Sequence, residues 1–244
     1  MSLLEGSNVS KNFGGLKALY DVNFVVEQGE IVGLIGANGA GKTTLFNVIS
    51  GVYGPSSGQV RFKGEKITGM KPHQICRKGL GRTFQVVKPF LNMTVLRNVC
   101  VGKLFGRDRL KHRKDAEREA GQILELIGLF QKADVLAREL TLADRKRLEI
   151  GRALATNPEL LLLDEVLAGL TPAETTQAMI LIREIQQNLG VTTLMVEHVM
   201  KAVIGVCSRI LVLHYGKKIA EGTPQEITEN PAVIEAYLGE KLAF

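Results

Sequence analysis

Cysteine is scarce in this sequence, with three in 244 residues: Cys76, Cys100 and Cys207. The number is odd and no two of them have the C-x-x-C spacing, which argues against a disulfide framework and against a zinc knuckle. We expect three ordinary thiols, buried or half-buried. The four histidines are scattered along the chain, which disfavours a metal centre built from imidazoles.

Long hydrophobic runs are also missing. No apolar stretch approaches the roughly 18 residues needed to cross a bilayer, and residues 1–5 lack the basic and then apolar pattern of an export signal. Low-complexity linkers and internal repeats are absent as well. The expectation is a globular chain that stays in the cytoplasm.

The charge is basic, with 31 Lys and Arg against 25 Asp and Glu. Such an excess suits contact with nucleic acid or with anionic lipid head groups, and charge alone does not choose between them. Much of the excess lies in residues 103–118, where acidic residues are interleaved with basic ones. We interpret this segment as a solvated stretch leading into a helix, in preference to a dedicated binding patch.

Apolar runs bounded by glycine and proline predict strands, and three- and four-residue spacing predicts helices. The expected helices cover 42–50 and 173–188, and residues 93–155 form a helical lobe. Because buried strands alternate with helices, we expect a mainly parallel sheet covered on both faces. The expected strands are 4–9, 19–26, 30–35, 58–62, 160–163, 191–196 and 209–213.

A glycine-rich segment, residues 36–44, follows the apolar run 31–35 and leads into a helix. Its G-x-x-x-x-G-K-T spacing in this context predicts a phosphate-binding loop of a nucleoside triphosphate site, rather than a chance turn. Its glycines turn backbone N–H groups toward a polyphosphate, the lysine contacts the outer phosphates and the first threonine binds Mg²⁺. The residues are Gly36, Ala37, Asn38, Gly39, Ala40, Gly41, Lys42, Thr43 and Thr44.

Two carboxylates, Asp164 and Glu165, end the leucine run 160–163. In α/β folds the carboxyl end of a buried parallel strand is where a nucleotide-bound metal is held. We expect Asp164 to reach Mg²⁺ and Glu165 to activate the attacking water as a general base. The alternative is two acidic residues that merely end a strand at the surface.

The ordered set of motifs resembles the ATP-binding subunit of ABC transporters over nearly the whole chain. The resemblance implies a P-loop NTPase core with a mainly parallel sheet, an N-terminal antiparallel β part and an inserted helical lobe. One domain would span 1–244, with 1–87 and 157–244 as the nucleotide-binding core and 88–156 as the helical subdomain. The motifs are Phe13 before a glycine pair, the loop 36–44, Gln85, the segment 140–154, Asp164-Glu165, the turn 168–171 and His198.

The same resemblance implies roles for three residues outside the loop. Phe13 would stack on adenine, Gln85 would touch Mg²⁺ or the attacking water, and His198 would hydrogen-bond the γ-phosphate and steady Glu165. Without the family, they would be interpreted as a strand-end aromatic, a surface glutamine and a structural histidine.

The segment 140–154 is similar to the family's signature helix, whose start caps the γ-phosphate bound to a second subunit. Thr141, Ala143 and Asp144 would therefore contact nucleotide. Leu142 and Ala143 stand where the family usually has glycines, and the added bulk could hold the two chains apart or slow hydrolysis. Thr141 and Asp144 fit a capping box that starts a helix there.

Within the family, residues 82–85, 168–170 and 221–240 look most like the ATPases of branched-chain amino acid importers, whose relatives serve urea and short amides. The ATPase of lipopolysaccharide export shares the tail pattern and is the alternative. ABC ATPases acting on DNA or ribosomes fit poorly, because the 85–140 interval is short and there is one phosphate loop. A regulatory module without turnover is a further alternative, which Glu165 disfavours and the altered signature favours.

The implied cofactors are ATP and Mg²⁺. The implied partners are membrane permease subunits, a second ATP-binding subunit, either a second copy or a paralogue, and indirectly a substrate-binding protein, but no nucleic acid. The chain would then be cytoplasmic and peripheral on the inner face of the cell membrane.

Overall fold

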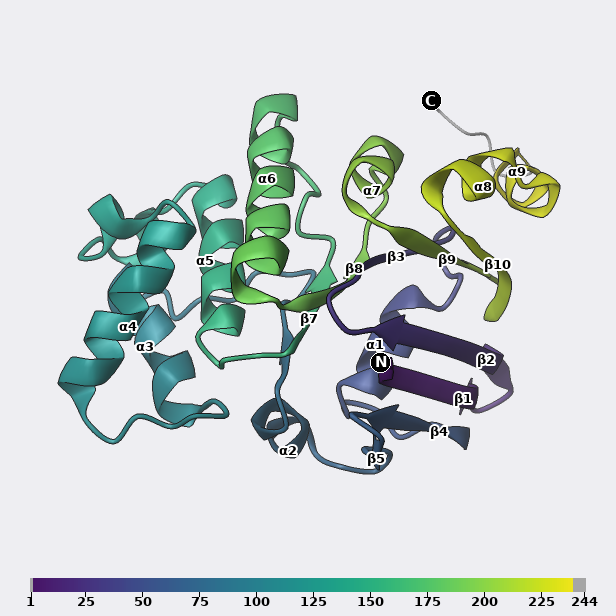
Figure 1. The fold of residues 1–244 in the computed structure, drawn as a ribbon, viewed down its shortest axis with the longest axis horizontal. Coiled ribbons are helices and arrows are strands. Elements are labelled where there is room, and N and C mark those ends of the chain that lie inside the picture. The colour runs from purple at the N-terminus through teal and green to yellow at the C-terminus, as the bar shows by residue number, and fades with distance from the viewer. Residues whose placement is uncertain (1, 239–244) are drawn as a thin grey trace. The chain divides into compact units, whose positions relative to one another are not determined.

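The computed structural model describes residues 2–238 (Figure 1). The chain divides into two compact units. The sheet unit contains the residues up to Pro72 and those from Thr192 onward, and the helical unit contains His73–Val191.

The sheet unit contains an antiparallel sheet from the N-terminal part of the chain. Its strands are β1 (Ser2–Phe13), β2 (Leu16–Glu27), β4 (Ser57–Phe62) and β5 (Glu65–Lys66), in the order β2-β1-β4-β5. The expected strands 4–9, 19–26 and 58–62 lie within β1, β2 and β4. This sheet is the antiparallel β part implied by the family resemblance.

The same unit has a second, mainly parallel group of strands. Strand β3 (Ile31–Ile35) pairs in parallel with β8 (Thr192–Val196) and with β9 (Arg209–His214), and β10 (Lys217–Gly222) adds to β9 in the antiparallel sense. All residues of β3 and β8 are buried, as expected for parallel strands covered on both faces.

Within residues 2–238, four helices lie wholly in the sheet unit. They are α1 (Lys42–Ile49), α7 (Met200–Val206), α8 (Pro224–Glu229) and α9 (Pro231–Leu238). Figure 1 shows α7, α8 and α9 on one side of the β3-β9-β10 strands and the antiparallel sheet on the other. A short loop connects the end of β3 to the start of helix α1. The position of β3 in the sheet therefore determines where this helix begins.

The helical unit begins within α2 (Pro72–Arg77) and contains a parallel strand pair, β6 (Leu80–Arg82) and β7 (Leu160–Asp164). Between these strands come α3 (Val95–Phe105), α4 (Arg113–Leu126), two 3₁₀ turns (Phe130–Lys132 and Ala137–Glu139) and α5 (Leu142–Leu154). Helix α6 (Pro172–Leu189) follows β7. Figure 1 shows α3, α4 and α5 packed together in the range 93–155 where the sequence predicts a helical lobe.

Helices α3 and α5 approach closely at Gly102. A Cβ atom added there would lie 2.5 Å from the Cβ of Ala155 and 2.9 Å from the main-chain oxygen of Arg152. Only glycine fits at this crossing, because both distances are shorter than van der Waals contact.

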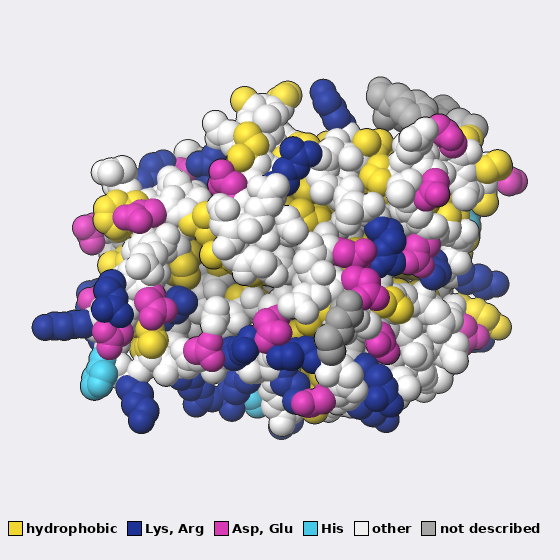
Figure 2. All heavy atoms as spheres, viewed as in Figure 1, with side chains coloured by type: hydrophobic (Ala, Val, Ile, Leu, Met, Phe, Trp, Pro, Cys, Tyr) yellow, Lys and Arg dark blue, Asp and Glu magenta, His cyan; other side chains and the backbone are white. Residues whose placement is uncertain are grey.

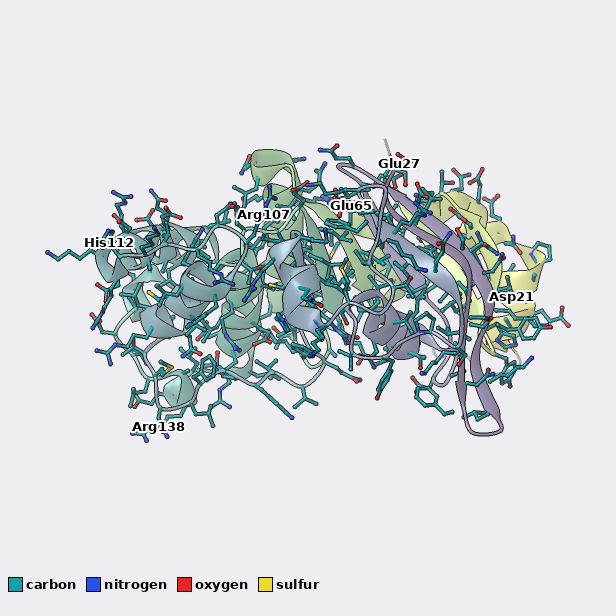
Figure 3. The ribbon with its side chains drawn as sticks, turned by 90° about the horizontal axis from the view of Figure 1, so that it is seen from below. Asp21, Glu27, Glu65, Arg107, His112 and Arg138 are labelled. Carbon is teal, nitrogen blue, oxygen red and sulfur yellow. The ribbon has the colours of Figure 1, made fainter. Side chains whose placement is uncertain are left out.

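The basic segment 103–118 runs from the end of α3 into α4 and carries several ion pairs. Lys103 pairs with Glu119 at 3.1 Å, and Arg107 pairs with Glu159. Figure 3 labels Arg107 and His112 on this segment, and Figure 2 shows acidic and basic side chains interspersed around α4. The segment leads directly into α4 at Arg113, in agreement with our interpretation of a solvated stretch before a helix.

The three thiols are free, with Cys100 and Cys207 buried and Cys76 half-buried, as expected. Burial, assisted by the charge of Glu197, raises the pKa of the Cys207 thiol to about 12. This cysteine therefore stays protonated and unreactive at neutral pH. No helix within residues 2–238 combines the length and the apolar character that a membrane span requires.

Candidate active site

The phosphate loop, residues 36–44, connects β3 to α1 in the sheet unit. Gly36 and Gly41 have φ angles of +151° and +104°, which side-chain-bearing residues rarely adopt. A Cβ atom on Gly36 would lie 2.2 Å from the main-chain oxygen of Leu213, and one on Gly41 would lie 2.6 Å from that of Ala18. Gly36 and Gly41 are therefore required both by backbone conformation and by space.

Lys42 is the first residue of α1, and its side chain folds back over the loop. Its Nζ donates to the main-chain oxygens of Gly36 at 2.6 Å and Ala37 at 2.9 Å. The residue is only 5% exposed. The ammonium is thus held inside the curve of the loop, where it can meet an anion that the loop surrounds.

The start of α1 has the features of an anion-binding terminus. Gly41 offers no side-chain cap, and the first turn contains no acidic residue. The first N–H groups of a helix have no partner within it, and the helix dipole adds a partial positive charge there. Asn38, Gly39 and Thr43 are exposed, Thr44 is half-buried and Ala40 is buried. This donor set fits a polyphosphate.

Phe13 and His198, the other site residues expected in this unit, lie at the ends of strands. Phe13 ends β1, is 42% exposed and makes an edge-to-face contact with Tyr53, with ring centroids 5.3 Å apart. The Nζ of Lys11 lies 5.1 Å from the Phe13 ring centroid. His198 is exposed and follows β8, whose Val196 is paired with Leu34 of β3. The segments carrying the phosphate loop and His198 therefore leave the same edge of the sheet.

Asp164 ends β7 in the helical unit and is fixed from β6. Its side chain is 0% exposed and accepts a hydrogen bond from the guanidinium of Arg82 at 3.0 Å. Its main-chain N–H donates to the hydroxyl of Thr83 at 3.0 Å. Burial lowers the pKa of Arg82, and the hydrogen bond and charge of Asp164 oppose this change. Arg82 thus orients this carboxylate, and Thr83 fixes the main chain that carries it.

Glu165 has a φ angle of +50°, a left-handed conformation that is uncommon for a residue with a side chain. Its Oε2 accepts a hydrogen bond from Nε2 of Gln85 at 2.8 Å. Its main-chain oxygen accepts hydrogen bonds from Nζ of Lys146 at 2.9 Å and from the N–H of Ala168 at 3.3 Å. The structure therefore brings together two of the expected site residues, Gln85 and Glu165.

Helix α5 begins as the sequence predicts, with Thr141 as its N-cap. The Thr141 hydroxyl accepts a hydrogen bond from the N–H of Asp144 at 3.2 Å. The carboxylate of Asp144 does not complete a reciprocal capping box but binds the Thr141 hydroxyl at 3.0 Å and Nζ of Lys132 at 2.5 Å. Burial opposes ionisation of Asp144, but the hydrogen bonds from Lys132 and Thr141 outweigh it and lower the pKa of this carboxyl.

Leu142 and Ala143 occupy the first turn of α5. Leu142 is 51% exposed, and its Cδ2 lies 3.3 Å from the position that a Cβ atom on Gly169 would take. Ala143 is half-buried. The leucine therefore lies over the turn 168–171 in the same unit.

Three contacts in the helical unit were missed by sequence reasoning. They are the Arg82 pair with Asp164, the Lys146 bond to the main chain of Glu165 and the Lys132 bond to Asp144. Each joins residues that are distant in the sequence, by up to 82 positions, and no local pattern marks them.

Comparison with known proteins identifies two family matches. The model of the ABC transporter family matches residues 19–168, and that of the branched-chain amino acid ATP-binding cassette transporter matches residues 217–243. The second match includes the whole stretch 221–240 on which the resemblance to branched-chain amino acid importers rests. Residues 239 and 240 lie outside the described residues.

Two curated relatives have the same identity to this chain. They are the high-affinity branched-chain amino acid transport ATP-binding proteins BraF of Pseudomonas aeruginosa and LivG of Escherichia coli K12. Each is 42% identical over 250 residues, which cover 98% of this chain and 98% of the relative.

Solved structures agree in fold. A nucleotide-free ATP-binding cassette from an ABC transporter superimposes with a TM-score of 0.90 at 33% identity, covering 98% of this chain and 100% of the other. A dimeric bacterial ABC transporter cassette superimposes with a TM-score of 0.83 at 25% identity, covering 91% and 99%. With the motifs described above, these matches show that the chain belongs to the ABC transporter family as an ATP-binding cassette, most like the cassettes of branched-chain amino acid transport.

Proposed function

We propose that this chain hydrolyses ATP to energise an importer of branched-chain amino acids or related small amides. The observation that carries the proposal is the phosphate loop, with the Lys42 ammonium held inside its curve. The cargo class is supported by the printed function of the relatives and by the family match at residues 217–243. The same relatives disfavour the lipopolysaccharide exporter and the non-transport alternatives.

In this proposal the sheet unit binds the nucleotide. Main-chain N–H groups of Gly39, Gly41 and the first turn of α1 would surround the phosphates, and Lys42 would neutralise the outer two. Gly36, Asn38 and Ala40 would shape the loop. Phe13 is exposed at the end of β1 and would stack on adenine.

Three oxygen-bearing side chains would hold Mg²⁺: Thr43, Gln85 and Asp164. Hydroxyl, amide and carboxylate oxygens are the ligands that this hard cation prefers, so the donor set fits. Bound Mg²⁺ would act as a Lewis acid and stabilise the charge that develops on the phosphates. Arg82 contributes by keeping the Asp164 carboxylate in one orientation before the nucleotide arrives.

Glu165 is the proposed general base. Its carboxylate would accept a proton from the water that attacks the γ-phosphate. The hydrogen bond from Gln85 restricts the rotation of this carboxylate. His198 would hydrogen-bond the γ-phosphate and steady Glu165.

A second ATP-binding chain would complete the site. Thr141, Ala143 and Asp144 lie at the start of α5. The helix dipole and the N–H groups of Leu142 and Ala143, which precede the capped N–H of Asp144, would face the γ-phosphate of the partner chain. Leu142 adds bulk at this surface. We expect this bulk to weaken the association of the two ATP-binding chains around the nucleotide. Light scattering on Glu165→Gln should show dimers with ATP and monomers with ADP.

We further propose that residues 1–87 and 157–244 act as the nucleotide-binding core and 88–156 as the helical subdomain. Membrane permease subunits would recruit the cassette to the inner face of the membrane, and a substrate-binding protein would act through them. The test is reconstitution of the chain with its permease partners in lipid vesicles. ATP hydrolysis should rise when leucine-loaded binding protein is added and should not respond to lipopolysaccharide. Stimulation by lipopolysaccharide alone would contradict the proposal.

A further inference from the structure

We propose that Lys146 is a positioning residue for Glu165, acting from helix α5 of the same chain. Its ammonium donates to the main-chain oxygen of Glu165 at 2.9 Å. This inference rests on the proposed role of Glu165 as the general base. Lys146 would act through Glu165 and would not itself touch nucleotide.

The burial of Lys146 is the first argument. The residue is only 6% exposed, whereas lysine is rarely found buried. Burying an ammonium group is costly unless hydrogen bonds compensate, so a lysine here is not explained by packing alone. A methionine of similar length would fill the space at lower cost.

The backbone conformation of Glu165 is the second argument. A left-handed residue with a side chain persists only where its surroundings hold it. The hydrogen bonds from Lys146 and from the N–H of Ala168 both end on the Glu165 carbonyl. Because the carbonyl fixes the peptide plane, it also fixes the direction in which the side chain leaves the backbone.

The carboxylate of Glu165 is held separately, by Gln85, and the segment after Gln85 is also tied to α5. Arg152 of α5 donates to the main-chain oxygen of Lys88 at 3.0 Å, and its guanidinium lies 4.9 Å from the ring centroid of Phe90. A hydrogen bond of 2.8 Å to Glu149 holds Arg152 in place. Helix α5 therefore contacts the main chain of Glu165 through Lys146, and through Arg152 it contacts the segment that follows Gln85.

This arrangement predicts a specific kinetic effect. Lys146→Met should lower kcat by roughly 10- to 100-fold, the range that a small misplacement of a reacting group produces. ATP affinity should be unchanged, because the phosphate loop is intact. Lys146→Arg should recover most of the activity, since arginine keeps a long cationic donor.

A matched control is available in the same unit. Lys103 is a half-buried lysine whose ammonium also has a defined partner, Glu119 at 3.1 Å, and Lys103→Met should leave kcat unchanged. Thermal unfolding of each variant shows whether it is folded. If Lys146→Met does not fold, Lys146→Gln takes its place. We then expect kcat to be low in Lys146→Gln and mostly recovered in Lys146→Arg.

A double-mutant cycle distinguishes this inference from the proposed function itself. In a Glu165→Gln background, Lys146→Met should cause little further loss, because the group that it positions no longer acts. Normal kcat in Lys146→Met, a full additional loss in the Glu165→Gln background, or an equal loss in Lys103→Met would each overturn the inference. If Glu165→Gln alone retains normal turnover, the proposed base is wrong, whatever Lys146 does.

Discussion

The guanidinium of Arg82 lies 3.0 Å from the carboxylate of Asp164, and the two side chains are only 7% and 0% exposed. Removing one partner of a buried ion pair leaves an uncompensated charge away from water. Arg82→Met should therefore lower the free energy of unfolding by about 3 to 5 kcal/mol. Urea denaturation followed by circular dichroism measures this change.

The control is an ion pair in the same unit that is exposed to solvent. Arg118 and Asp115 lie 3.7 Å apart and are 69% and 44% exposed, and removal of such a pair costs at most about 1 kcal/mol. Equal losses in Arg82→Met and Arg118→Met would show that burial of the Arg82 pair contributes nothing.

Lys42→Ala tests the phosphate loop. A charge-assisted hydrogen bond contributes roughly 1.5 to 3 kcal/mol, so ATP affinity should fall about 10- to 150-fold in titration calorimetry. Lys66→Ala, at an exposed position on β5, is the control and should bind normally. Unchanged affinity in Lys42→Ala would contradict the assignment of the loop.

Phe13→Ala separates recognition of the base from recognition of the phosphates. Loss of aromatic stacking, worth roughly 1 to 3 kcal/mol per base, should weaken ATP binding but leave inorganic tripolyphosphate binding unchanged. Tyr20 is another aromatic on the same sheet with 42% exposure and a lysine near its ring. Tyr20→Ala should therefore affect neither ligand, and a loss of tripolyphosphate binding in Phe13→Ala would argue against stacking.

The pKa of Asp144 predicts a pH dependence of stability. Burial opposes ionisation, but hydrogen bonds from Lys132 and Thr141 lower the pKa below its usual 3.8. A carboxyl with a lowered folded-state pKa stabilises the protein above its unfolded pKa, and this stabilisation is lost as the pH falls through the folded value. Lys132→Met should thus be less stable than the unaltered chain at about pH 7, and the difference should shrink as the pH falls below 3.8, the usual pKa of this carboxyl. A constant difference across urea titrations at these pH values would contradict this explanation.

Much of the fold is visible in the sequence because its central strands are continuous apolar runs. The leucines at 160–163 and the segment 31–35 each appear as strands where predicted. Strand β10 was missed because Lys217–Gly222 is largely polar and partly exposed, and it exists through its pairing with β9. Helix α7 was missed because Met200–Val206 is too short for helical spacing to stand out.

The candidate site also has features that the sequence predicts and features that it does not. The phosphate loop and the Asp164-Glu165 pair are contiguous in sequence, so spacing alone predicts them. The supports of the carboxylates are not contiguous: Arg82 reaches Asp164 because β6 and β7 pair in a register that aligns Arg82 with Leu162, and Lys146 reaches Glu165 from another helix. Such contacts depend on tertiary packing, which a local pattern does not record.

The central claim is that the chain binds ATP and cleaves it with Glu165 as the general base. The most direct test is steady-state ATP hydrolysis by Glu165→Gln together with ATP binding by the same protein, with the exposed Glu184→Gln as control. We expect turnover to fall roughly 10²- to 10⁴-fold while ATP still binds, and the control to behave normally. Near-normal turnover in Glu165→Gln would contradict the account.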